Sequence, residues 1–286
     1  MSSGRDRLLF PAANIWRSDL LAYYERVSQP LVDACVGRAV TLIRYPRGVG
    51  QPGFFQKFVT TRGRRCAIRI EDPAELLGWV RQGAVEFHLP LGVRGVPGST
   101  PALHDWAVMD LDPHPPAGWP RVVQAAQAVA RLFDHVGMPM SVKTSGGRGV
   151  HILVPIRPTE AADATEAMER LARVACAVSP DVMTVVRRVG DRGPRVYLDY
   201  LQNSGHRTMA AVYGVRAREP APVSWPTAVG ALASLEPDHH RVATVLQGQA
   251  VPVWGRGPAV DLPSALERAG IPPVRTLRQL AADGAR

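Results

Sequence analysis

The spacing of hydrophobic and polar positions divides the chain into helices and strands. Apolar residues recur three and four positions apart in four segments, which predicts helices over 18–37, 72–83, 118–137 and 159–178. Short alternating or continuous apolar runs predict strands over 39–46, 54–59, 84–89, 106–112, 195–202 and 208–217, and a hairpin over 139–156. The segment from about residue 223 onward is rich in Pro, Ala and Gly, which predicts short helices packed over the core.

Residues at the segment ends refine these bounds. Ser18 is the predicted N-cap of the first helix, and Asp72 caps the second, with Pro73 at its first position. Residues 92–101 predict a loop inside the domain, because strand-like sequence lies on both sides of them. Hairpins mixed with crossover helices favour an α/β or α+β fold of mixed β-sheets flanked by helices, built as a single domain over 1–286.

Two aspartates stand one residue apart in the run "WAVMDLD". Read with period 2, Asp110 and Asp112 point the same way from the end of a buried strand that Pro113 terminates. Such a pair is often only part of a solvated loop, but like charges this close disfavour each other's ionisation unless a cation lies between them. Their position favours a site for Mg²⁺ or Mn²⁺, which carboxylate oxygens suit better than they suit zinc.

The segment "KTSGGRGVH" places Ser145, Arg148 and His151 around one glycine turn. Three glycines let the backbone turn tightly and approach a ligand closely. The order of residues is not that of a Walker A loop. An ordinary glycine hairpin and a phosphate-binding hairpin both remain open.

Two further groups carry charge in apolar surroundings. Asp199 lies in the predicted strand "RVYLDYLQN", where an unpaired buried carboxylate is costly and an arginine partner or a shared metal would relieve it. Arg216 and Arg218 alternate in "GVRARE" and would face the same side of a strand. They indicate either a solvated basic edge or a grip on an anion such as a triphosphate.

The segment "PGFFQK" follows a glycine turn. Phe54 and Phe55 would point to opposite faces of a strand, so at least one is expected in the core, and the other would offer a surface on which a base stacks. Lys57 follows them as a basic neighbour.

Composition limits the class of protein. The 286 residues are 46% hydrophobic and 21% charged, which is ordinary for a globular domain. A net charge of +9, in which Arg far outnumbers Lys, favours a polyanionic partner, although a genome-wide Arg bias gives the same figure. Cys35, Cys66 and Cys176 are odd in number and not in metal-binding spacing, and no segment is apolar enough to span a membrane or to be a signal peptide. We therefore expect a cytoplasmic protein.

Three aspartates, a glycine hairpin and paired arginines together are the components of phosphoryl transfer. In a two-metal site, one cation activates an attacking oxygen and the other stabilises the leaving phosphate. The residues alone thus favour either nucleotidyl transfer or phosphodiester hydrolysis on a nucleic acid.

Four blocks then appear in one order: "MDLDP", "VKTSGGRGVHILVP", "VYLDYLQN" and "VRAREPAPVSWP". In order and spacing they resemble the polymerase domain of bacterial ligase D, a member of the archaeo-eukaryotic primase superfamily. "LLAYYERV", "TLIRYPRGVGQPGFFQKF" and "GAVEFH" also fit, so the resemblance runs from about 6 to about 226, with 227–286 as a helical C-terminal part.

The resemblance implies roles for particular residues. Metal-binding carboxylates would be Asp110, Asp112 and Asp199; nucleotide-binding residues would be Ser145, His151, Arg216, Arg218, Gln202, Arg148 and His88; DNA-binding residues would be Phe54, Phe55, Lys57, Arg7 and Arg17. Arg7 and Arg17 would bind a downstream 5′-phosphate. Arg148 stands where the family usually has lysine, and the segment 59–72 is shorter than the family's loop, which puts end-bridging in doubt.

The resemblance implies a template-dependent polymerase, or primase-polymerase, that adds ribo- or deoxynucleotides at primer 3′ ends. With two Mn²⁺ or Mg²⁺ ions it would fill short gaps in DNA during end joining or excision repair. Because 286 residues leave no room for ligase or nuclease domains, we expect a stand-alone member near the bacterial nucleoid, working with separate ligase or end-joining proteins. A metal-dependent nuclease and a non-catalytic module that binds DNA gaps or ends are the alternatives.

Overall fold

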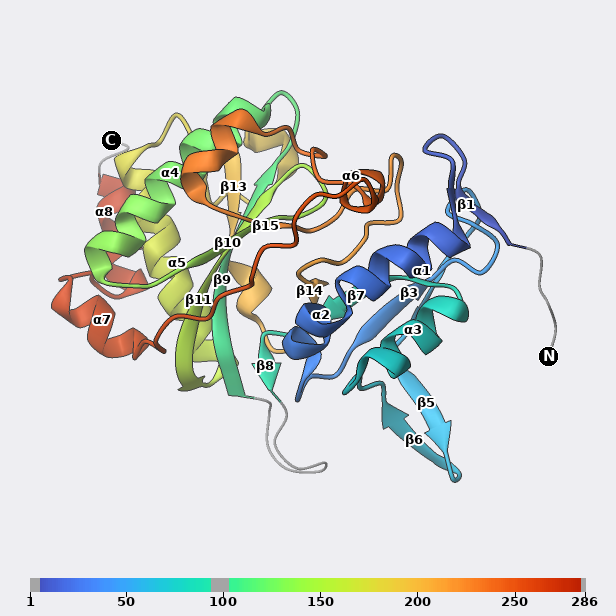
Figure 1. Cartoon of the computed structure of the whole chain (residues 1–286). Coiled ribbons are helices and arrows are strands. Elements are labelled where there is room, and N and C mark those ends of the chain that lie inside the picture. The colour runs from blue at the N-terminus through green and yellow to red at the C-terminus, as the bar shows by residue number, and fades with distance from the viewer. Residues whose placement is uncertain (1–5, 94–102, 284–286) are drawn as a thin grey trace.

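A computed structural model describes residues 6–93 and 103–283 (Figure 1). The helices are α1 Arg17–Arg26, α2 Ser28–Cys35, α3 Pro73–Arg81, α4 Trp119–Val136, α5 Ala161–Val178, α6 Val242–Leu246, α7 Leu262–Arg268 and α8 Val274–Asp283, with 3₁₀ turns η1 Val189–Asp191, η2 Tyr200–Asn203 and η3 Val229–Ser234. The strands are β1 Leu8–Phe10, β2 Ile15–Trp16, β3 Thr41–Arg44, β4 Phe54–Gln56, β5 Phe58–Thr61, β6 Arg64–Ala67, β7 Ala84–Leu89, β8 Gly92–Val93, β9 Leu103–Pro113, β10 Ser141–Thr144, β11 Val150–Thr159, β12 Met183–Thr184, β13 Val196–Asp199, β14 Met209–Ala210 and β15 Pro226–Thr227. Most of the predicted loop 92–101 lies outside the described residues.

The larger sheet has the strand order β12-β13-β9-β11-β10-β15, with β8 paired to β9. Helices α4 and α5 cover one of its faces (Figure 1). Because side chains alternate along a strand, Ala107, Met109 and Leu111 of β9 pack under these helices. The even-numbered residues of β9, among them Asp110, therefore face the other way, toward the second sheet.

The second sheet has the order β14-β7-β3-β4 and is packed against α1, α2 and α3 (Figure 1). Buried tyrosines of α1 anchor it: Tyr24 donates a hydrogen bond to the carbonyl of Val85 at 2.7 Å, and Tyr23 donates one to the carbonyl of Tyr213 at 2.6 Å. The hairpin β5–β6 projects from this part of the molecule (Figure 1). The two sheets face each other across a small apolar cluster that includes Met209 of β14 and Trp106 of β9.

Most predicted elements form. Asp72 caps α3 by accepting a hydrogen bond from the Glu75 amide at 2.8 Å, and Gly137 ends α4 in the left-handed conformation. The predicted hairpin over 139–156 is the antiparallel pair β10–β11. The predicted helix over 18–37 is instead two helices, broken at Val27, and Ser18 lies inside α1, which begins at Arg17 after an extended Trp16.

The predicted strand over 208–217 is wrong beyond Ala210. Within this run only Met209–Ala210 form a strand, β14; the chain then turns, with Tyr213 at φ +62°, and Val215 makes a single antiparallel bridge to Val223. The run is apolar because Ala211, Val212 and Tyr213 pack into the core beneath the second sheet, not because it continues a strand. Arg216 and Arg218 thus do not lie on one strand.

The C-terminal part forms short helices, as the composition predicts. Val242 and Val245 of α6 pack beside the second sheet, and Leu262 and Leu266 of α7 pack beside the helices of the larger one. In the described part of the chain, no helix has the length and apolar character needed to cross a membrane.

Candidate active site

Four polar side chains lie side by side across four strands of the larger sheet. In the antiparallel register Asp199 is opposite Asp110, Asp110 is opposite His151, and His151 is opposite Lys143. Residues that are directly opposite share a face, so the row runs across β13, β9, β11 and β10 on the face without helices. Strand pairing thus brings together carboxylates that lie 89 residues apart in the sequence, at 110 and 199.

The carboxylates of this row repel one another. Burial first, and then the charges of Asp199 and Asp112, raise the pKa of Asp110 to about 7. Burial also raises the pKa of Asp199, whose Oδ1 accepts a hydrogen bond from the Leu201 amide at 3.0 Å. Excess negative charge in a mostly buried place is the condition that a bound cation relieves.

Asp112, two residues farther along the same face of β9, is more exposed. Its side chain is 54% exposed and its Oδ2 lies 3.4 Å from Arg192, whose guanidinium also stacks 4.0 Å from the Tyr197 ring centroid. Among the described residues, no three His, Cys, Asp or Glu side chains converge as a metal-binding group. The oxygen donors nevertheless fit a hard divalent cation in kind, and the buried Oε1 of Gln202 has no hydrogen-bond partner beside them. Its Nε2 lies 3.4 Å from Asp110 Oδ2.

The glycine turn between β10 and β11 is organised by Ser145. Its hydroxyl oxygen accepts hydrogen bonds from the amides of Gly147 at 3.0 Å and Gly149 at 3.2 Å. A Cβ at Gly149 would stand 2.2 Å from the carbonyl oxygen of Leu111, so this position needs glycine for the hairpin to lie against β9. The turn is therefore held directly beside the aspartate strand.

Both arginines of "VRARE" reach this turn from the loop after β14. Arg216 donates to the carbonyl of Ser145 at 3.2 Å, and Arg218 donates to the carbonyl of Gly147 at 3.1 Å. Burial, together with the neighbouring Arg216 and Arg148 cations, lowers the pKa of Arg218. Arg148 itself is exposed at the tip of the turn. Cations thus cluster around the hairpin although no strand places them there.

A buried glutamate that the sequence did not single out organises this cluster. Glu86 of β7 accepts hydrogen bonds from Arg216 Nε at 2.9 Å and from the Ala217 amide at 2.8 Å, and its Oε2 lies 2.8 Å from His88 Nε2. Burial alone would raise the pKa of Glu86, but these three partners outweigh it and lower that pKa. Arg192 and Lys143 also lie at the site. The sequence patterns did not indicate either residue, because a single cation does not stand out in a chain that has 34 Lys and Arg residues.

The match to known proteins follows this geometry. Residues 17–251 match the model of a family described as LigD, primase-polymerase domain. The chain belongs to this family. A multifunctional non-homologous end joining protein LigD of Pseudomonas aeruginosa is 31% identical over 249 residues, which are 80% of this chain and 29% of that protein. A bifunctional LigD of Bacillus subtilis is 31% identical over 236 residues, 77% of this chain and 38% of that protein.

The fold likeness covers nearly a whole domain of a solved relative. The polymerase domain of Mycobacterium tuberculosis ligase D, solved in complex with DNA, superposes with a TM-score of 0.77 at 28% identity, over 86% of this chain and 93% of that one. The expected primase-type fold and the expected LigD polymerase-domain family are thus confirmed. The chain spans only about a third of the length of the curated LigD relatives.

Within this LigD-type domain, the predicted DNA contacts lie on the part built around the second sheet. Phe54 and Phe55 are both exposed, at 46% and 69%, so the expectation that one of them is core is wrong. The reason is that β4 is an edge strand outside the hydrophobic core, and Phe54 is covered only in part, by the Arg44 guanidinium 5.3 Å from its ring centroid. Lys57 is exposed next to them.

Arg7 and Arg17 lie together at the start of this LigD-type domain. The Arg17 amide donates a hydrogen bond to the carbonyl of Arg7 at 2.8 Å. Arg7 is exposed, whereas Arg17 is half-buried, donates to the carbonyl of Pro46 at 3.3 Å and has a buried Nε without a partner. The backbones of the two arginines are thus adjacent, while the Arg17 Nε is enclosed by protein.

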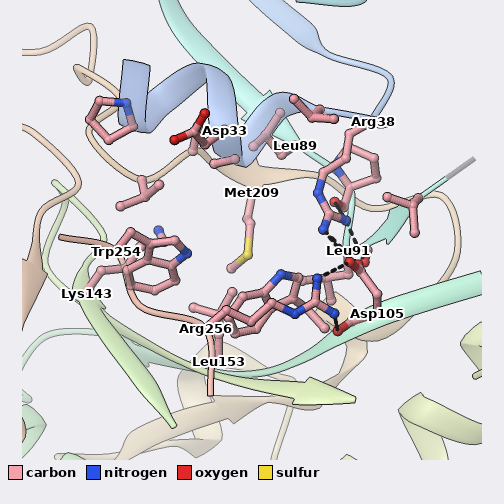
Figure 2. Close-up of a pocket in the computed structure, with 18 of the residues that line it drawn as sticks. Asp33, Arg38, Leu89, Leu91, Asp105, Lys143, Leu153, Met209, Trp254 and Arg256 are labelled. Carbon is pink, nitrogen blue, oxygen red and sulfur yellow. Dashed lines mark hydrogen bonds and ion pairs between the residues drawn. The ribbon is translucent and has the colours of Figure 1, made fainter. Parts of the chain in front are cut away.

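A cavity of about 450 Å³ lies between the two sheets (Figure 2). Trp254, Met209 and Leu153 line it, and Lys143 stands at its wall. Among the described residues, only Lys143 is shared between this cavity and the row of polar side chains. The cavity therefore lies at the Lys143 end of the row, with Lys143 and His151 between it and Asp110.

Proposed function

We propose that this domain is a template-directed nucleotidyltransferase that extends primer 3′ ends and fills short gaps in DNA. The observation that carries the proposal is the strand register that puts Asp199, Asp110 and His151 in one row, with the Ser145 turn beside it. The carboxylates supply cation ligands, and the turn with its arginines supplies hydrogen-bond donors for a triphosphate. The family match and the DNA-bound relative support the same chemistry.

Different residues of this chain would bind the nucleotide and the metal ions. Arg216 and Arg218 would bind the phosphates of an incoming ribo- or deoxynucleotide, with His151, Ser145 and Arg148 beside them, while His88 and Gln202 border the nucleotide. Asp110 and Asp112 would hold two Mn²⁺ or Mg²⁺ ions jointly, and Asp199 would hold the one nearer the primer end. When bound, these cations supply Lewis-acid stabilisation of the attacking and leaving oxygens.

The DNA would lie over the second-sheet part. Exposed Phe54 and Phe55 offer faces for stacking on template bases, and Lys57 adds charge beside them. Arg7 and Arg17 would bind the 5′-phosphate on the far side of a gap, which would let the domain recognise a gap rather than a free end. Ligation would then fall to a ligase, on this chain or another, in end joining or excision repair.

Primer extension tests the proposal. A labelled primer on gapped DNA with a downstream 5′-phosphate is incubated with each rNTP or dNTP and Mn²⁺ or Mg²⁺. Asp110→Ala should abolish templated addition while DNA affinity, measured by fluorescence anisotropy, stays at the wild-type value. Asp134→Ala, which removes an exposed carboxylate on α4, is the matched control and should extend normally.

The alternatives give different results in the same assay. Shortening of the strand without nucleotides would identify a metal-dependent nuclease. Binding without addition, in wild type and Asp110→Ala alike, would identify a gap-binding module. Either result, or extension by Asp110→Ala at the wild-type rate, would overturn the proposal.

A further inference from the structure

Lys143 is a buried lysine inside the candidate site. Its side chain is 2% exposed and its Nζ has three partners: His151 Nδ1 at 2.6 Å, Ser224 Oγ at 2.7 Å and the carbonyl of Ala210 at 3.0 Å. These partners come from β11, from the segment before β15 and from β14. The lysine therefore joins the two sheets directly behind His151.

The rest of the chain uses lysine almost nowhere. Of 34 Lys and Arg residues, only Lys57 and Lys143 are lysines, and Lys57 is exposed. Position 143 is thus an exception to the strong preference of this chain for arginine. A compact ammonium with three tetrahedral donors fits the three partners there, whereas a planar, longer guanidinium would not fit the same space.

The hydrogen-bond inventory assigns the donors. Ser224 donates its own hydroxyl proton to the carbonyl of Thr144 at 2.9 Å, so toward Lys143 its oxygen can only accept. The Ala210 carbonyl is an acceptor as well. Burial lowers the pKa of Lys143 to about 7, and the nearby Asp110 charge favours the ammonium. As an ammonium, Lys143 has three protons for three acceptors only when His151 Nδ1 is unprotonated, and a neutral imidazole with a bare Nδ1 carries its proton on Nε2.

We propose that Lys143 is a positioning residue that holds His151 in the Nε2–H tautomer. His151 Nε2 lies 3.5 Å from Asp110 Oδ1, so the proton it carries faces the carboxylates at which the nucleotide phosphates are proposed to bind. In that tautomer His151 donates to the triphosphate instead of presenting a lone pair that would repel it. The functional consequence rests on the proposed nucleotidyltransferase activity; the tautomer does not.

The tautomer is measurable on the wild-type protein without substrate. Uniform ¹⁵N labelling of histidine gives eight imidazoles, and the pair of signals lost in His151→Gln identifies His151. Two-bond ¹⁵N–¹H correlation spectra separate a pyrrole-type from a pyridine-type nitrogen. We expect a pyridine-type Nδ1 and a pyrrole-type Nε2. A protonated Nδ1, in either the other tautomer or the imidazolium, would overturn the proposal.

Variants then test the consequence. Lys143→Met keeps the aliphatic stem and removes the donors, so His151 should lose its fixed tautomer and the KM for nucleotide should rise by about tenfold, the scale on which such orienting partners act. DNA affinity should not change. Lys143→Arg should fail to restore either the spectrum or KM, although it keeps the charge. Lys57→Met, the matched loss of the other lysine, should leave the His151 spectrum unchanged.

A double variant separates positioning from direct contact. If Lys143 acts through His151, then adding Lys143→Met to His151→Ala should not raise KM beyond that of His151→Ala alone. Additive effects would show an independent role and contradict the proposal. If Lys143→Met does not fold, the wild-type spectrum still decides. If wild type shows the expected tautomer but adds no nucleotide, the proposed function fails while this assignment stands.

Discussion

At the scale of single residues, Glu86 links two side chains that the family resemblance treats separately. Its carboxylate is bonded to Arg216 and lies against His88, so its charge fixes both on the same side of the cleft. A hydrogen bond to a charged partner contributes about 1.5–3 kcal/mol. In Glu86→Gln the KM for nucleotide should therefore rise by about tenfold or more, with a smaller change in kcat.

A structural role alone would give a different pattern for this variant. Steady-state extension with varied nucleotide separates KM from kcat, and anisotropy measures DNA affinity, which should not move. Glu71→Gln, at an exposed carboxylate just before α3, is the matched control. An unchanged nucleotide KM in Glu86→Gln would show that Arg216 needs no anchor.

Glu86 also shows why some site residues cannot be predicted from the sequence. Its position in "AVEFHL" alternates like an ordinary strand residue, and its partner Arg216 is 130 residues away. Charges whose function depends on such distant pairing carry no local signal. Asp110 and Asp112 could be identified from the sequence, because two carboxylates stand out in an otherwise apolar run.

At the scale of elements, the β10–β11 hairpin depends on Gly149. Any side chain there would meet the Leu111 carbonyl of β9, a backbone atom that cannot move aside. Gly149→Ala should therefore lower the free energy of unfolding by about 1–3 kcal/mol, as overpacking does in well-packed places, and should lower nucleotide addition as the turn shifts from the aspartates. Urea unfolding and primer extension measure the two effects.

Gly190→Ala is the control for this prediction. No atom lies within 4 Å of a Cβ built at Gly190, so the same substitution there should change stability by less than about 0.5 kcal/mol. A Gly149→Ala protein as stable as this control would show that the hairpin accommodates a side chain at 149.

Helices whose ends are marked by capping residues could be predicted from the sequence. Segments whose structure depends on packing against distant residues could not. Asp72 with Pro73, and the glycines at 118 and 137, mark helix ends by their own chemistry. The run 208–217 has strand-like composition, but only contacts with distant segments decide that it turns after Ala210. The prediction that Phe54 or Phe55 is buried is wrong for the same reason. Whether a strand lies at the edge of a sheet depends on distant segments, and its own sequence does not show it.

At the scale of the whole molecule, the order of the sheets could not be read from the sequence without the family resemblance. Strand β9 lies between β13 and β11, which come later in the chain, and this arrangement assembles the row of polar side chains. The sequence patterns alone indicated the aspartates, the glycine hairpin and the paired arginines of the site. The resemblance supplied their assembly, because four blocks in a fixed order identify a topology that periodicity does not encode.

One ion cluster joins distant parts of that topology (Figure 2). Asp105 Oδ2 of β9 accepts hydrogen bonds from Arg38, which precedes β3, at 2.9 Å and from Arg256 of the C-terminal segment at 2.9 Å. The Arg38 side chain is only 8% exposed, whereas that of Arg256 is 44% exposed and can turn to water. Asp105→Ala would leave Arg38 buried beside no anion, which should lower the free energy of unfolding by about 3–5 kcal/mol.

Urea unfolding of matched variants decides whether the unpaired charge is the cause. Asp191→Ala removes a carboxylate 3.8 Å from exposed Arg188 and should lower stability by less than about 1 kcal/mol. If the penalty comes from the unpaired arginine, then Asp105→Leu combined with Arg38→Met should be more stable than Asp105→Ala alone, because both charges are gone and apolar volume remains. A double variant as unstable as Asp105→Ala would mean that the bonds themselves, rather than the stranded charge, hold the two sheets and the C-terminal segment together.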